Sequence, residues 1–129
     1  MAQRLPLAVL LVLVALAVAF TLPATSPASS CVNLHATGKL KKALRKAHKR
    51  LTDRPFSGPR KGSVYYGRCG SRYYALASFK DKEGGYQDQP ERFRRKKHHR
   101  WKDYGDTGGD GCGAPTPRKL LQLWGFDQC

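Results

Sequence analysis

Four cysteines constrain the fold of this 129-residue chain more than any other feature of its sequence: Cys31, Cys69, Cys112 and Cys129. None of them has the close Cys/Cys or Cys/His spacing of a zinc site. Small domains bury little apolar surface, and in oxidising compartments disulfides compensate for this. Three pairings are possible. We favour Cys31 with Cys69, which would pin the N-terminal arm to a sheet, and Cys112 with Cys129, which bracket one compact segment.

The N-terminus predicts export from the cytoplasm. Arg4 precedes an apolar run over residues 5–20, and a stretch rich in proline, serine and threonine follows, as in a signal peptide. The run is shorter than the roughly 20 residues of a membrane-spanning helix. Ser26 and Ala28 suit cleavage after Ala28. We therefore expect a signal peptide at residues 1–28 and one secreted domain at residues 29–129, with no membrane span after cleavage.

Cys31 leaves a second interpretation open, because a cysteine soon after a signal sequence can carry the lipid of a bacterial lipoprotein. The residues before Cys31 match that pattern loosely, and a polar gap separates it from the apolar run. Lipidation would also leave an odd number of cysteines in an oxidising space. A disulfide is therefore the favoured fate of Cys31.

The charge of the chain predicts its class of partner. There are 24 Lys and Arg residues against 9 Asp and Glu, and loss of Arg4 with the signal peptide leaves a net charge of about +14. Such an excess attracts polyanions, for example nucleic acid or an anionic cell-envelope polymer. The alternative is a surface that is charged for solubility and has no specific partner.

Residues 38–52 are expected to form a basic amphipathic helix. Thr37 can cap its N-terminus, and residues 53–55 would end it. Because the cations on its surface repel one another, the helix should depend on docking its apolar stripe. That stripe consists of Leu40, Ala43, Leu44, Ala47 and Leu51.

Residues 63–105 predict an antiparallel meander of four strands, after a linker over residues 55–62. Residues 63–69 and 72–79 flank a two-residue turn that starts at Gly70, which suits a type II′ hairpin. In the second strand, apolar side chains face both ways, as expected for a central strand that is covered on both sides.

Residues 91–95 and 100–104 predict the second hairpin, with Phe93 and Trp101 in its core and residues 96–99 at its tip. In the segment 112–129, Thr116 can cap a short helix that starts at Pro117 and ends at Gly125. The predicted fold class is therefore α+β: a basic N-terminal helix, a four-stranded antiparallel β-meander and a short C-terminal helix, stapled by disulfides.

Two basic segments supply the candidate polyanion-binding residues. In the second hairpin, cations alternate with aromatic residues, and cations neutralise phosphates while aromatic faces stack on bases. Charge reversal at Lys96 and Lys97 should weaken such binding. The candidates are Arg92, Arg94, Arg95, Lys96, Lys97, Arg100 and Lys102 in the hairpin and Lys41, Lys42 and Arg45 in the helix.

The histidines at the hairpin tip suggest an alternative function. His98 and His99 could supply the general acid and base of a small secreted ribonuclease, with Glu91 as their partner. Arg92 or Arg94 would then stabilise developing charge on the phosphate. Adjacent histidines point in different directions on a strand or turn, so we expect neither a metal site nor a cofactor.

Two further interpretations remain open. The basic helix could lie on an anionic membrane with its leucines inserted. The loop at residues 82–90 could instead bind or inhibit a protein partner.

Several stretches between residues 65 and 129 combine aromatic residues, glycines and cysteines. They are residues 65–70, 73–79, 88–93 and 101–109, and the ending from Cys112 through Trp124 and Gly125 to Cys129. Together, over about half of the chain, they resemble a group of small secreted proteins from actinomycete bacteria to which no activity is assigned. The resemblance implies an exported bacterial protein, and it carries over no catalytic residue.

The sequence thus predicts a secreted, monomeric domain that binds a polyanion without acting as an enzyme. The alternative is a small secreted hydrolase, in particular a ribonuclease.

Overall fold

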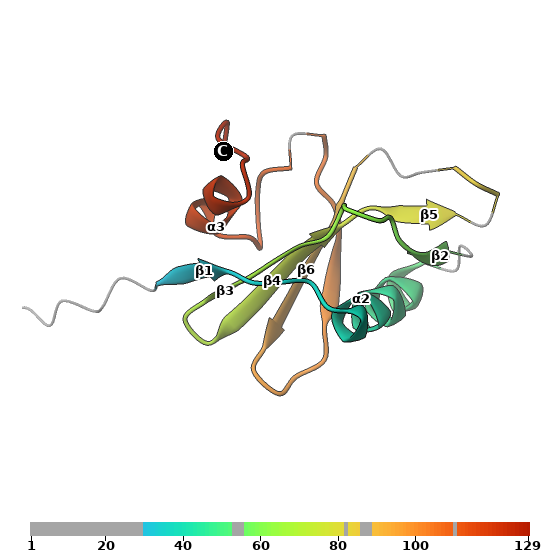
Figure 1. Ribbon diagram of the computed structural model, residues 1–129, viewed down its shortest axis with the longest axis horizontal. Coiled ribbons are helices and arrows are strands. Elements are labelled where there is room, and N and C mark those ends of the chain that lie inside the picture. The colour runs from blue at the N-terminus through green and yellow to red at the C-terminus, as the bar shows by residue number, and fades with distance from the viewer. Residues whose placement is uncertain (1–29, 53–55, 82, 86–88, 110) are drawn as a thin grey trace, which may run out of the picture.

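Antiparallel strand pairing organises the chain in a computed structural model, which describes residues 30–52, 56–81, 83–85, 89–109 and 111–129. A five-stranded sheet has the order β1-β3-β4-β6-β7, and β2 pairs with β5 in a separate two-stranded sheet (Figure 1). The strands are β1 (Cys31–Asn33), β2 (Phe56–Pro59), β3 (Tyr65–Cys69), β4 (Arg72–Ala77), β5 (Phe79–Asp81), β6 (Glu91–Lys96) and β7 (Lys102–Asp106). The helices are α2 (Gly38–Leu51) and α3 (Arg118–Leu123).

The predicted α+β class, with an antiparallel sheet, a basic N-terminal helix and a short C-terminal helix, is confirmed. The predicted count of four strands is wrong, because β1 adds an edge strand beside β3. The predicted linker contains β2, and the strand expected over residues 72–79 stops at Ala77. There the Ser63 hydroxyl donates to the Ser78 carbonyl and accepts from the Ser78 amide. These side-chain bonds take the place of strand-to-strand hydrogen bonds at Ser78, and β5 begins at the next residue.

Strand β4 lies in the middle of the sheet, with both faces covered, as its sequence predicts. Tyr74 and Leu76 pack on one side against a cluster that includes Leu120, Leu121 and Trp124 of the C-terminal segment. Ala75 and Ala77 pack on the other side, against α2. The core therefore has two layers, one on each face of the sheet.

Helix α2 docks through its apolar stripe. The Thr37 side chain accepts a hydrogen bond from the Leu40 amide at 3.2 Å, which confirms the predicted cap. Leu40, Leu44 and Ala47 are buried, but Leu51 at the last turn is 56 % exposed, so its expected place in the core is wrong. The residues predicted to end the helix, 53–55, lie outside the described part of the chain.

Both predicted hairpins form. Gly70 has a φ of 57° at the first turn position between β3 and β4, which a residue without Cβ adopts freely. Strands β6 and β7 make the second hairpin, and Phe93 and Trp101 are buried, as expected.

Helix α3 starts one residue later than predicted. Pro117 occupies the N-cap position, and its carbonyl accepts hydrogen bonds from the amides of Leu120 and Leu121. The Thr116 hydroxyl is buried and has no hydrogen-bond partner among the described residues, so the expected Thr116 cap is wrong. Gly125 follows the helix with a φ of 87°.

The two favoured disulfides are confirmed. Cys31 and Cys69 lie directly opposite each other on β1 and β3 and are bonded, and Cys112 is bonded to Cys129. The bond to Cys69 leaves Cys31 without a thiol that could carry a lipid. Within the described ranges, no helix is long and apolar enough to cross a bilayer. The predicted signal peptide, residues 1–28, lies outside those ranges.

Candidate anion-binding groove

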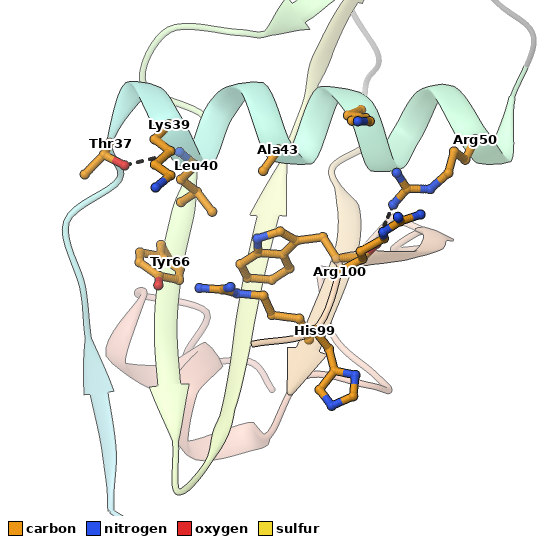
Figure 2. Close-up of a pocket in the computed structure, with 11 residues that line it drawn as sticks. Thr37, Lys39, Leu40, Ala43, Arg50, Tyr66, His99 and Arg100 are labelled. Carbon is orange, nitrogen blue, oxygen red and sulfur yellow. Dashed lines mark hydrogen bonds between the residues drawn. The ribbon is translucent and has the colours of Figure 1, made fainter. Parts of the chain in front are cut away.

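A groove with a volume of about 500 Å³ lies between α2 and the β6–β7 hairpin (Figure 2). Its floor is formed by Leu40, Ala43, Tyr66 and Trp101. Its walls carry cations, and no Asp or Glu is among the described residues that line it. We call it the basic groove, and its cations are Lys39, Lys46, Arg50, Arg95 and Arg100.

One flank of α2 provides the first wall. Lys39, Lys46 and Arg50 are seven and four residues apart, so they lie on the same side of the helix. Leu40 and Leu44 are buried against the sheet and fix the rotation of α2 about its axis. Because the apolar stripe is docked on the sheet, the side of α2 that carries these three cations faces the hairpin.

Arg95 on β6 dominates the second wall. Alternation along the strand puts it on the same face as Phe93, which packs against α2. Its guanidinium lies 4.7 Å from the ring centroid of Tyr73 and 5.1 Å from that of Trp101. Its Nε is buried without a hydrogen-bond partner among the described residues. Ring contacts thus hold this cation, and no described carboxylate neutralises it.

Arg50 joins the two walls. One of its terminal nitrogens donates to the Trp101 carbonyl at 2.7 Å, a bond between α2 and the hairpin that Figure 2 marks beside Arg100. A second depression, of about 370 Å³, shares Arg50, Arg100 and Trp101 with the groove and continues past Ala47 to Lys102 and Asp103. The groove therefore extends along much of the length of α2.

The groove contains some of the candidates named from the sequence. Arg95 and Arg100 line it, and Lys102 lines its continuation. Arg92 instead donates to the carbonyls of Ala114, Tyr104 and Gly105. Arg94 donates to the Tyr104 hydroxyl at 2.6 Å. Both side chains lie on the opposite face of the sheet, where they hold loops in place.

The remaining candidates lie elsewhere. Lys96 and Lys97 are exposed at the end of the hairpin. Lys41 lines a different depression, beside residues 33–36, and Lys42 faces outward from α2. The Arg45 side chain passes within 3.9 Å of the position that a Cβ would take at Gly58, next to β2.

Lys39, Lys46 and Arg50 were not among the candidates, although they are part of the predicted basic helix. The signal that could have identified them is their shared flank beside Leu40 and Ala43. Helical periodicity predicts that these three residues share one side of the helix, but it does not predict which other element lies opposite that side.

The residues of the ribonuclease alternative are not brought together. His98 and His99 are exposed at the turn that follows β6, whereas Glu91 is buried at the other end of that strand. The His99 ring points away from α2 at the edge of the groove (Figure 2).

Behind the groove lies a buried polar cluster that the sequence analysis missed. His48 Nδ1 and Asp103 Oδ2 are 2.7 Å apart, and both side chains are almost fully buried. The His48 ring stacks on Phe79, with 4.2 Å between centroids, and Asp103 Oδ1 accepts from the Gly105 amide. His48 lies four residues after Leu44, in line with the leucine stripe, which is the signal that could have revealed it.

His48, Asp103 and Glu91 offer ligand atoms that all lie within 4.8 Å of one another, so they are the described residues best placed to hold a metal ion. The short hydrogen bond and the ring stacking already give His48 and Asp103 a structural role, which is to fasten α2 to β7.

Comparison with known proteins gives no relative on which to base a function. No family model, no curated protein and no solved structure matches the chain.

Proposed function

We propose that this protein is an exported, non-enzymatic domain that binds a polyanion in the basic groove. The observation that carries the proposal is the state of Arg95. Its guanidinium lies close to two aromatic rings, has no acidic partner in the described chain and lines a groove with four other cations. A ligand with phosphate or similar groups supplies charged acceptors for these cations.

The extent of the groove favours a polymer over a small anion. A helix rises about 1.5 Å per residue, so Lys39 and Arg50 are roughly 16 Å apart along the axis of α2. Lys102 extends the row of cations beyond that point. A chain of anionic groups can meet all of these cations at once, and its affinity then falls steeply with salt.

The lining of the groove favours binding over hydrolysis. Cleavage of a phosphodiester by general acid–base catalysis needs two positioned groups that exchange protons near neutral pH. Among the described residues that line the groove, His99 is the one imidazole and none is a carboxylate. Asp103 lines the continuation of the groove, but its carboxylate is bound to His48 and to the Gly105 amide. Export is supported by the two disulfides, which form and persist in oxidising compartments.

Charge-removing substitutions test the proposal. We expect Arg95→Gln with Arg100→Gln to weaken binding of fluorescently labelled inorganic polyphosphate by roughly tenfold or more, because hydrogen bonds to charged groups contribute about 1.5–3 kcal/mol each. The slope of log Kd against log salt should fall by about one for each lost contact. Fluorescence anisotropy over a series of salt concentrations measures both quantities.

The matched control removes the same charge from the outer face of α2, with Lys42→Gln and Lys49→Gln, and should change Kd far less. Equal losses in the two double variants would mean that net charge alone attracts the polymer. No loss in the Arg95/Arg100 variant would end the proposal.

A further inference from the structure

The sheet face next to the basic groove carries an unusual row of side chains. Arg68, Tyr73 and Arg95 lie directly opposite one another on β3, β4 and β6. Directly opposed side chains share a face of the sheet, here the face on which α2 packs. Figure 2 shows α2 crossing the strands at one end, with Tyr66 on the part of the face beyond the helix. This row therefore continues the groove onto the less covered part of the sheet face, beyond α2.

Two tyrosine rings form the apolar part of this surface. The rings of Tyr66 and Tyr73 are 6.2 Å apart between centroids and only 20° from parallel, and both residues are half-buried. Part of each tyrosine therefore remains accessible to a ligand.

The cations frame these rings on three sides. Arg68 is exposed at one end of the row, and Arg95 covers the ring of Tyr73 at the other. Lys39 lines the groove together with Tyr66, at the first turn of α2. Half-buried tyrosines and cations thus lie side by side on this surface.

We infer that the basic groove and this row bind single-stranded nucleic acid, an inference that rests on the proposed function and names its ligand. Unpaired bases contact Tyr66 and Tyr73, while the phosphates lie on Arg68, Arg95, Arg100 and Lys39. Aromatic side chains on an open sheet face are suited to unstacked bases, because every base has a flat π-face. Polyphosphate and other ring-free anionic polymers would leave the tyrosines unused. A duplex keeps its bases stacked inside.

A comparison of two strands with equal charge tests the inference on the unmodified protein. One is a labelled oligothymidylate of about 12 nucleotides, within the size range of single-strand binding sites. The other is an abasic phosphodiester strand of the same length. We expect the oligothymidylate to bind at least roughly tenfold more tightly, since stacking of one base on an aromatic ring strengthens binding by about fivefold or more. Equal affinities would overturn the inference.

Substitutions then locate the contact. Tyr66→Leu removes a ring without changing charge, so it should weaken oligothymidylate binding severalfold and leave abasic-strand binding unchanged. Tyr73→Leu also removes a ring that holds Arg95, so it should weaken binding of both strands, and that of the oligothymidylate more. Far-UV circular dichroism checks that each variant is folded, and if one variant fails to fold the other still answers the question.

The arginine variant separates the two proposals. If Arg95→Gln with Arg100→Gln weakens binding of both strands while Tyr66→Leu weakens binding of neither, the groove binds polyanions without using bases, and only this inference fails. If the arginine variant weakens neither strand, the proposed function fails as well.

Discussion

His48 and Asp103 fasten α2 to β7 with charged or polar groups in a place where water is nearly excluded. His48 is 2 % exposed and Asp103 is 7 % exposed. When one partner of such a pair is removed, the other is left in an apolar environment without a hydrogen-bond partner. The free energy of unfolding then typically falls by more than the intact pair contributes to it. The pair therefore joins α2 to β7 in the core behind the basic groove.

The Asp103→Ala variant should lose about 3 kcal/mol in its free energy of unfolding, because His48 Nδ1 and the Gly105 amide both lose their acceptor. Guanidinium denaturation with the disulfides intact measures the change. Asp106→Ala is the control, since Asp106 is exposed and accepts one hydrogen bond, from the Gly108 amide. Similar small losses in both variants would show that the buried pair is not a fastening point.

At the level of elements, a glycine permits the close packing of α3 on the sheet. A Cβ built on Gly67 in β3 would lie 2.5 Å from a Leu120 methyl carbon and 2.8 Å from the Val32 carbonyl oxygen. The leucine can rotate, but Val32 belongs to the paired backbone of β1. Any side chain at this position therefore pushes β1 or α3 away from β3.

We expect Gly67→Ala to lower the free energy of unfolding by about 1–3 kcal/mol, the usual range for overpacking a well-packed core. Gly38→Ala at the start of α2 is the comparison, because no atom lies within 4 Å of its built Cβ. Thermal unfolding followed by circular dichroism gives both values. A Gly67→Ala protein as stable as the Gly38→Ala protein would contradict the packing that places α3 on β3.

The elements that the sequence predicted are those with strong local signals. Helix α2 has a cap and a periodic apolar stripe, and both hairpins have a clear alternation or a glycine turn. Strands β1 and β2 have neither. The first is three residues long and is tied to β3 by Cys31, and the second contains Gly58 and Pro59. Their pairing depends on distant partners, which local periodicity does not report.

The candidate site was predictable to a similar degree. Arg95 and Arg100 belong to a run whose composition indicates anion binding, and they line the groove. Arg92 and Arg94 belong to the same run but lie on the opposite face, held by Ala114 and Tyr104. Composition identified the segment, whereas the pleat of β6 decided which cations share a surface.

Across the whole molecule, the charge is far larger than one groove needs. The full chain carries a net charge of +15, and cations such as Lys42 and Lys97 lie away from the groove. Such a field speeds the approach of any polyanion and is screened by salt. This general attraction differs from the proposed specific contact, in which Arg95 and its neighbours meet the ligand directly.

Specific binding in the basic groove and general electrostatic attraction are distinguished most directly by nuclear magnetic resonance. The ¹⁵N-labelled protein is titrated with inorganic polyphosphate at physiological salt. If the ligand lies in the basic groove, the largest shift changes fall on the Nε–H signals of Arg95, Arg100 and Arg50 and on the amides around Lys39 and Lys46. Changes centred on Arg92 and Arg94, on the Lys41 and Arg45 flank of α2, or spread evenly over all the cations would contradict binding in the groove.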